Sequence, residues 1–194
     1  MNVLTERQRE IIDVAIEIIA TRGIQNLTIK NISMKIGFSE PAVYRHFKSK
    51  TEILLSILSM FEDRIQEFIA RLNSDKSSSL GKLNLICTNH FNTFSDNPVM
   101  ASVIFSEEIF QDEKKLAEKI YSIMNINFEF MKTIIEKGVE SKEIRSDIEV
   151  EQLTMIIMGS LRLIIKRWTL SNYSFDLKSD GKKLWESLNK ILSK

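Results

Sequence analysis

Residues 28–55, TIKNISMKIGFSEPAVYRHFKSKTEILL, constrain the fold more than any other part of this sequence. They predict two short helices that are joined by a glycine turn and followed at once by a longer helix. One face of the first helix is apolar, because isoleucines recur at spacings of three and four: Ile29, Ile32 and Ile36. Gly37 is expected to end that helix in the left-handed conformation, and Ser39 to cap the next one, where Pro41 is tolerated in the first turn. The pattern is typical of a helix-turn-helix, which implies double-stranded DNA as a partner.

The second helix, expected over residues 40–47, is short, and its apolar side chains Val43 and Phe47 face inward. Small side chains near its start allow a close approach to base edges and thymine methyls, while the polar and basic ones suit bases and phosphates. An S-x-x-E capping box at residues 49–52 is expected to open the following helix beside Lys50, where a phosphate meets free helix amides and a cation. The predicted DNA-binding residues are Thr28, Ser39, Glu40, Pro41, Ala42, Tyr44, Arg45, His46, Lys48 and Lys50.

This stretch resembles the DNA-binding domain of the TetR family of bacterial transcriptional regulators. The residues that carry the resemblance are Gly23, Thr28, Ile32, Gly37, Tyr44, Phe47, Lys50 and Leu54. Two positions depart from the usual pattern, Ser33 in place of alanine and Thr51 in place of an acidic residue, and neither is a predicted DNA contact. With the helices described below, the resemblance implies an all-α, TetR-like fold of nine helices. A three-helix helix-turn-helix domain is expected at residues 1–50, and a helical effector-binding and dimerisation domain at residues 51–194.

Composition and charge agree with this interpretation. Six glycines and two prolines in 194 residues leave few helix breakers, so helices are expected to dominate. Residues 1–50 carry eight Lys and Arg against five Asp and Glu, a net charge of +3, and the remainder carries −2. The asymmetry has the sign that DNA binding requires but is small, so affinity is expected to depend on a dimer. A single cysteine and an N-terminus without the apolar core of a signal peptide predict a reducing cytoplasm, with nucleoid association when DNA is bound.

Breakers and apolar spacing divide the rest of the chain into helices. They are expected over residues 5–21, 50–72, 80–94, 98–110, 112–141, 150–170 and 178–192. The first of them is expected to begin at a capping pair, Thr5 and Gln8, and Asn97 is expected to cap the helix that Pro98 opens.

The segment 150–170 is apolar on nearly every side, so other helices must cover it all round. Residues 178–192 add a stripe of leucine and isoleucine. The simplest account is a four-helix dimer interface with a second copy, as the resemblance also implies, and the alternative is a core helix in a monomer. The predicted interface residues are Met155, Gly159, Leu163, Leu184, Leu188 and Ile191.

The resemblance further implies a pocket for a small-molecule effector in the C-terminal domain. Its candidate lining is Phe61, Cys87, His90, Phe91, Phe94, Phe105, Phe128, Met131, Met158 and Arg162, although residues at such spacing also form plain core. The charge of Arg162 needs an internal partner such as Glu107 or Glu108, or an anionic ligand. Cys87 and His90 lie three residues apart, but two ligands without a third do not define a metal site, so no metal and no cofactor is predicted.

Three segments of the C-terminal half carry a second resemblance, to a TetR subgroup that includes nucleoid-occlusion proteins. They are residues 97–119, Arg167-Trp168 and Phe175-Asp176. Ordinary regulators share this subgroup pattern, so it places the chain without naming its role.

The sequence therefore predicts a homodimeric, ligand-responsive repressor that binds a palindromic operator and leaves it when an apolar or amphipathic effector shifts the spacing of the two DNA-binding heads. The alternative is a DNA-bound adaptor of the nucleoid-occlusion kind, which acts through a protein partner. An enzyme is not expected, because the two histidines, His46 and His90, fall in different predicted domains. No glycine-rich phosphate loop is present and no set of acid, base and nucleophile emerges, so no catalytic residue is predicted.

Overall fold

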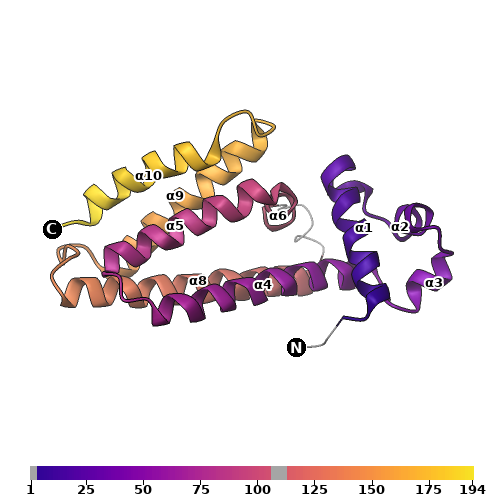
Figure 1. The fold of residues 1–194 in the computed structure, drawn as a ribbon, viewed down its shortest axis with the longest axis horizontal. Coiled ribbons are helices and arrows are strands. Elements are labelled where there is room, and N and C mark those ends of the chain that lie inside the picture. Colours follow the sequence, from indigo (N-terminus) through magenta and orange to yellow (C-terminus); the bar gives the residue numbers. More distant parts are fainter. Residues whose placement is uncertain (1–3, 106–112) are drawn as a thin grey trace. The chain divides into compact units, whose positions relative to one another are not determined.

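The computed structural model of the protein describes residues 4–105 and 113–194, and these contain nine α-helices, one short 3-10 helix and no strand (Figure 1). The predicted all-α class is thereby confirmed. The chain forms two compact units: unit 1 comprises Met1–Arg64 and Ser102–Tyr121, and unit 2 comprises Ile65–Ala101 and Ser122–Lys194. Within the described ranges, no helix is both long enough and apolar enough to cross a membrane.

Unit 1 is built on the N-terminal helices. These are α1 (Glu6–Arg22), the 3-10 helix (Ile24–Asn26), α2 (Ile29–Ile36), α3 (Glu40–Tyr44) and the first part of α4 (Lys50–Ser74). The predicted capping pair opens α1, since the Thr5 hydroxyl accepts the Gln8 amide at 3.2 Å and the Gln8 side chain accepts the Thr5 amide at 3.0 Å. The apolar face of α1 is buried and packs against α2, which in turn packs against α3.

Two long helices contribute to both units. Within α4 the division falls after Arg64, and within α8 (Lys114–Glu140) it falls after Tyr121. The short helix α6 (Pro98–Ile104) is likewise divided after Ala101. The domain boundary predicted at residue 50 lies inside unit 1. The division of DNA binding and effector binding at that residue stays a prediction.

Unit 2 gathers α5 (Ser79–Asp96), α9 (Val150–Leu170) and α10 (Leu177–Leu192) around one core, in which α10 packs along both α5 and α9 (Figure 1). A glycine allows the closest of these approaches. A Cβ built on Gly181 of α10 would fall within 3.0 Å of the Phe91 ring on α5, so only glycine fits there without displacing the ring.

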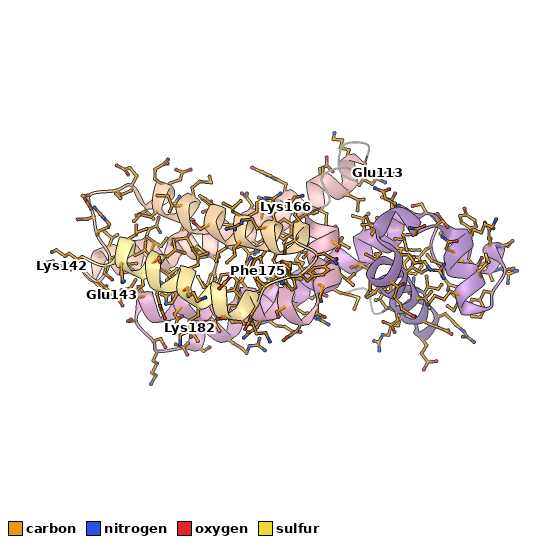
Figure 2. All side chains as sticks on the ribbon, turned by 90° about the horizontal axis from the view of Figure 1, so that it is seen from above. Glu113, Lys142, Glu143, Lys166, Phe175 and Lys182 are labelled. Atoms are coloured by element: carbon orange, nitrogen blue, oxygen red, sulfur yellow. The ribbon has the colours of Figure 1, made fainter. Side chains whose placement is uncertain are left out.

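The turn between α9 and α10 is fixed by a buried tryptophan. Trp168 donates its indole N–H to the carbonyl of Phe175, which Figure 2 labels, at 3.0 Å. The Tyr173 ring meets the indole edge-on at 4.7 Å between centroids. Asp176 then caps α10 by accepting the amides of Lys178 and Ser179. The predicted ends of α9 and α10 are therefore set by specific side-chain contacts.

Most predicted helix bounds agree with the structure to within two residues, and α9 occupies the predicted 150–170. The helix predicted over 40–47 is shorter and ends at Tyr44, because the amides of His46 and Phe47 both turn back to the Val43 carbonyl, at 3.0 and 3.1 Å. The helix predicted over 98–110 is described as far as Ile104, and the rest of that prediction lies outside the described residues.

Candidate nucleic-acid interface and effector region

The turn between α2 and α3 has the geometry of a helix-turn-helix. Thr28 caps α2 by accepting the Asn31 amide at 3.1 Å. Gly37 has φ 77° and ψ 25°, the left-handed conformation predicted for it, and both its amide and the Phe38 amide bond the Ser33 carbonyl. The two helices are thus joined by a tight turn that two backbone hydrogen bonds close.

One face of α3 is buried and the opposite face is exposed. Val43 and Phe47 lie in the core of unit 1, as predicted. Tyr44 is 49% exposed, and Arg45, Glu40 and Pro41 are also exposed, whereas Ala42 is half-buried. A row of polar side chains therefore faces outward from a rigidly packed helix, which is the arrangement that reads a major groove.

Two of the predicted contacts differ in detail from the expectation. Ser39 has the backbone conformation of an N-cap, but its side chain accepts no capping hydrogen bond, so its exposed hydroxyl is not used by α3. His46 is half-buried, and its carbonyl accepts the side-chain amide of Gln8 at 3.4 Å. With Gln8 it lines a shallow pocket of about 510 Å³ beside Phe47 and the start of α4.

The capping box predicted at residues 49–52 forms only in part. The Ser49 hydroxyl accepts the Glu52 amide at 3.2 Å, as expected. The Glu52 carboxylate, however, accepts the amide of Lys48 at 2.6 Å, one residue earlier than a capping box requires. This hydrogen bond fixes the backbone between α3 and α4. The Lys48 side chain is exposed.

The side chain of Lys50 is oriented by a hydrogen bond within unit 1. It is half-buried at the start of α4, and its ammonium donates to the Ile24 carbonyl at 3.3 Å. Burial lowers the pKa of this ammonium from its ordinary value. Its predicted role as a phosphate contact stays a prediction.

Two exposed residues of α2 were not predicted as contacts. The apolar side chain of Met34 is 71% exposed, and Lys30 is also exposed. The signal was present in the sequence, because neither position belongs to the buried stripe that contains Ile29 and Ile32. An exposed methionine and lysine beside the turn enlarge the outward face of this unit.

The first half of α4 is joined within unit 1 to the start of α8. The Thr51 hydroxyl donates to the Glu113 carboxylate at 3.0 Å, and Lys119 forms a part-buried ion pair with Glu62. The first half of α4 is therefore held by two polar contacts to residues that lie far away in the sequence.

The predicted dimer residues divide into an exposed group and a buried one. Met155, Leu163 and Ile191 are exposed, Leu163 at 61%, and a Cβ built on Gly159 would meet no atom within 4 Å. Their neighbours Ile156 and Leu170 are exposed as well. Leu184 is half-buried, and Leu188 lies in the core of its own chain. An apolar face on α9 is thus open in the single chain.

The ten predicted effector residues are divided between the two units. Phe61 and Phe105 belong to unit 1, and the other eight belong to unit 2. In unit 2 the side chains of Cys87, Phe91, Phe94 and Met131 are buried, and those of His90, Phe128, Met158 and Arg162 are half-buried. None of the ten lines the pocket beside His46 or the pocket described below at the end of α5.

Two titratable members of this set are held in their neutral forms. Burial raises the pKa of the Cys87 thiol to about 12 and lowers the pKa of His90 to about 4. His90 packs edge-on against Phe94 at 4.8 Å between centroids. Arg162 has its guanidinium 4.0 Å from the Met124 sulfur, and the two acids predicted as its partners lie outside the described residues.

Comparisons with known proteins agree along nearly the whole chain. Residues 11–57 match a family model described as bacterial regulatory proteins, tetR family, and residues 61–190 match one described as YsiA-like protein, C-terminal region. The fatty acid metabolism regulator protein of Bacillus subtilis (strain 168) is 27% identical over 171 residues, which cover 87% of this chain and 86% of that protein.

Two further proteins resemble the chain. The nucleoid occlusion factor SlmA of Photobacterium profundum is 21% identical over 193 residues, which cover 97% of this chain and 96% of that protein. A crystal structure of the transcriptional regulator FadR from Bacillus subtilis in complex with stearoyl-CoA has a TM-score of 0.78 at 25% identity, and the match covers 94% of this chain and 98% of that one.

Proposed function

Since the chain belongs to the TetR family of bacterial regulatory proteins, we propose that it represses transcription as a homodimer on a palindromic operator and that an effector releases it. It is a DNA-binding transcriptional regulator. The observation that carries the proposal is the outward face of α3, where Tyr44 and Arg45 stand exposed above the buried Val43.

A two-fold dimer presents two copies of α3 to the DNA, so the operator has matching half-sites about 34–36 Å apart. The exposed apolar face of α9, with Met155, Gly159 and Leu163, supports dimerisation through this helix. A dimer also doubles the modest positive charge of the N-terminal residues, which strengthens the attraction to phosphates.

We propose an effector of the long-chain acyl-CoA class. The support is the 25% identical regulator whose structure contains stearoyl-CoA, together with the aromatic and methionine side chains of unit 2. Phe91, Phe94 and Met131 offer the apolar surroundings that an acyl chain requires. Effector binding then favours a dimer in which the two α3 helices no longer match the half-sites.

We further infer that the chain works by binding alone, at the chromosome in the cytoplasm. Its relatives are transcriptional regulators, and the two histidines lie in different units, His46 against Gln8 and His90 against Phe94. Within the described residues, no group of three or more His, Cys, Asp and Glu side chains could hold a metal ion.

The proposal is tested by measuring the binding of a fluorescent operator duplex by anisotropy at several salt concentrations. Arg45→Ala is expected to weaken operator binding about tenfold or more, because an arginine contact to a base or phosphate is lost. Lys48→Ala is expected to lower the slope of log affinity against log salt by about one. Arg64→Ala is the matched control, since Arg64 is exposed on α4 of the same unit and carries the same charge.

The effector is tested in the same assay with stearoyl-CoA and with coenzyme A alone. Stearoyl-CoA is expected to release the operator and coenzyme A is not. Equal weakening by Arg45→Ala and Arg64→Ala would contradict the assignment of α3, and an operator complex that stearoyl-CoA leaves intact would contradict the effector class.

A second function, that of a DNA-bound adaptor acting through a protein partner, is favoured by one observation. The resemblance to the nucleoid occlusion factor extends over 193 residues and so includes both units. Many chromosomal sites without an effector response would support this alternative over a local repressor.

A further inference from the structure

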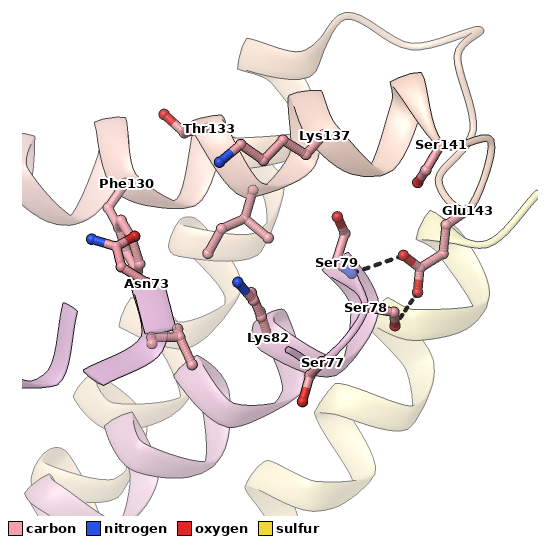
Figure 3. Close-up of a pocket in the computed structure, with 12 residues that line it drawn as sticks. Asn73, Ser77, Ser78, Ser79, Lys82, Phe130, Thr133, Lys137, Ser141 and Glu143 are labelled. Atoms are coloured by element: carbon pink, nitrogen blue, oxygen red, sulfur yellow. Dashed lines mark hydrogen bonds between the residues drawn. The ribbon is translucent and has the colours of Figure 1, made fainter. Parts of the chain in front are cut away.

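A polar pocket of about 540 Å³ lies in unit 2, where the end of α4, the start of α5 and the end of α8 meet (Figure 3). Its volume is within the usual range of small-molecule sites. The residues that line it are Leu72, Asn73, Ser77, Ser78, Ser79, Lys82, Phe130, Thr133, Ile134, Lys137, Ser141 and Glu143. None of them was predicted as a ligand-binding residue.

The floor of the pocket is apolar. Leu72 from α4 and Ile134 from α8 are buried, and Phe130 of α8 is half-buried beside them. These side chains offer a surface for an aliphatic or aromatic group, whose burial there removes apolar area from water.

The single acid in the lining is already hydrogen-bonded to the start of α5. The Glu143 carboxylate accepts the amides of Ser79 at 2.8 Å and Leu80 at 3.1 Å, and it also accepts the Ser78 hydroxyl. Its negative charge therefore satisfies the amides and the dipole at the start of α5. Gly138 permits this arrangement, since a Cβ built there would lie within 3.0 Å of both Ile144 and Ser79.

Two lysines enter the same opening from its two sides. Figure 3 shows Lys82 from α5 and Lys137 from α8 with their ammonium groups directed into the space above the apolar floor. Neither ammonium forms a hydrogen bond or a contact ion pair anywhere in residues 4–105 and 113–194. The Asp75 carboxylate is outside the lining and accepts the Ser77 amide at 2.7 Å. Its pKa is lowered by its hydrogen bonds with Ser77 first and by the charge of Lys82 last.

We propose that this pocket binds an amphipathic anion. The carboxylate or phosphate of the ligand lies between Lys82 and Lys137, where the hydroxyl of Ser79 supplies a further donor. Its apolar body lies against the floor. An anion supplies these two ammonium groups with a partner of opposite charge, because neither forms a contact ion pair with an acid in residues 4–105 and 113–194.

This site is distinct from the outward face of α3 and from the ten predicted effector residues, so it goes beyond the proposed function. Two sources share the required chemistry, a free fatty acid and an aliphatic phosphate. The test therefore uses octanoate and octyl phosphate as probes, with octanol and inorganic phosphate as the two halves of the ligand.

Binding is measured by titration calorimetry on the full chain. One equivalent of octyl phosphate or octanoate per chain is expected to bind, and octanol and phosphate are each expected to bind at least about tenfold more weakly, because each half forgoes one set of contacts. A stronger response to one of the two anions identifies the source. Failure of both anions to bind more tightly than octanol would overturn the proposal.

The matched variants are Lys82→Gln/Lys137→Gln and Lys76→Gln/Lys182→Gln. Both remove two positive charges from unit 2, but Lys76 and Lys182 are exposed and do not line the pocket (Figure 2). The first variant is expected to weaken anion binding about tenfold or more and the second to leave it unchanged. Equal weakening by the two variants would mean that the anion senses only the net charge, and the site would be rejected.

A measurement on the unaltered chain guards against a misfolded variant. Lysine acetylation is followed by mass spectrometry with and without octyl phosphate. The ligand is expected to protect Lys82 and Lys137 and to leave Lys76 and Lys182 as reactive as before. Uniform reactivity of all four would overturn the proposal, whereas the outcome of the stearoyl-CoA and operator experiment would not be affected by it.

Discussion

Because His90 is held neutral in the folded protein, we expect the free energy of unfolding to fall in mild acid. The ring of His90 lies on α5 and packs edge-on against Phe94 and Phe91, at 4.8 and 6.2 Å between centroids. Burial lowers the pKa of His90 from its ordinary 6.5 to about 4, so the folded protein holds the ring neutral. The unfolded chain takes up a proton between these two values and the folded chain does not. The free energy of unfolding must therefore fall as the pH falls through this window.

The size of the effect follows from the two pKa values. Each pH unit within the window is equivalent to about 1.4 kcal/mol, which sets a ceiling of about 3 kcal/mol below pH 4. Between pH 7.5 and 5 the same linkage gives about 2 kcal/mol. The ring of His90 keeps an exposed edge that water reaches, so we expect about 1–2 kcal/mol in this range.

The assay is urea unfolding at pH 7.5 and 5, at one protein concentration because dimerisation adds to the apparent stability. Buried Trp168 supplies the fluorescence signal. His90→Gln is the comparison, since its amide does not titrate and every other group is retained. The unaltered chain is expected to lose about 1–2 kcal/mol more than the variant between the two pH values. Parallel losses in the two proteins would refute the reasoning.

Three further predictions concern packing, dimerisation and capping. Gly181→Ala is expected to lower the free energy of unfolding by about 1–3 kcal/mol, because its Cβ would overlap the Phe91 ring, and urea unfolding measures this loss. Leu163→Glu is expected to shift the protein from dimer to monomer in sedimentation equilibrium without loss of helix content, and an unchanged dimer would remove α9 from the interface. Glu143→Ala is expected to lower the free energy of unfolding by about 1–2 kcal/mol through loss of the carboxylate at the start of α5, whereas Glu140→Ala, an exposed control on α8, should leave it unchanged.

The sequence was most informative where a structural feature depends on neighbouring residues. The capping pair at Thr5, the left-handed Gly37 and the bounds of α9 all follow from local spacing and backbone preference. One local hydrogen bond was predicted wrongly by one residue. The capping box required the Glu52 carboxylate to accept the amide of Ser49, and it accepts the amide of Lys48 instead. Capping rules name the backbone amides that a side chain can accept, but the geometry of the turn between α3 and α4 decides which amide Glu52 accepts.

Contacts between distant residues were beyond such rules. Lys50 and the Ile24 carbonyl are 26 residues apart and meet only because unit 1 folds around them. Apolar spacing correctly marked Phe61 and Cys87 as buried, but it does not say in which core a residue lies, and the structure divides them between units 1 and 2. The exposed side of α3 was predictable for the opposite reason, since the helix, its turn and its inward residues are contiguous in sequence.

The polar pocket illustrates the same limit for a candidate site. The residues that line it come from α4, α5, α8 and the turn after α8, as Leu72, Lys82, Lys137 and Glu143 show, and no motif connects them in the sequence. Each is an ordinary surface or core residue when it is considered alone. Only the meeting of three helix ends gives them a common function.

The central claim is that this chain is a sequence-specific, dimeric repressor that reads its operator with α3. Genome-wide mapping of its binding sites in the native cell tests that claim most directly. For a dimeric repressor we expect one or a few palindromic sites that overlap promoters, with half-sites about 34–36 Å apart, and loss of these sites in the Arg45→Ala variant. Binding to no site, or to dozens of sites scattered over the chromosome without dyad symmetry, would contradict it.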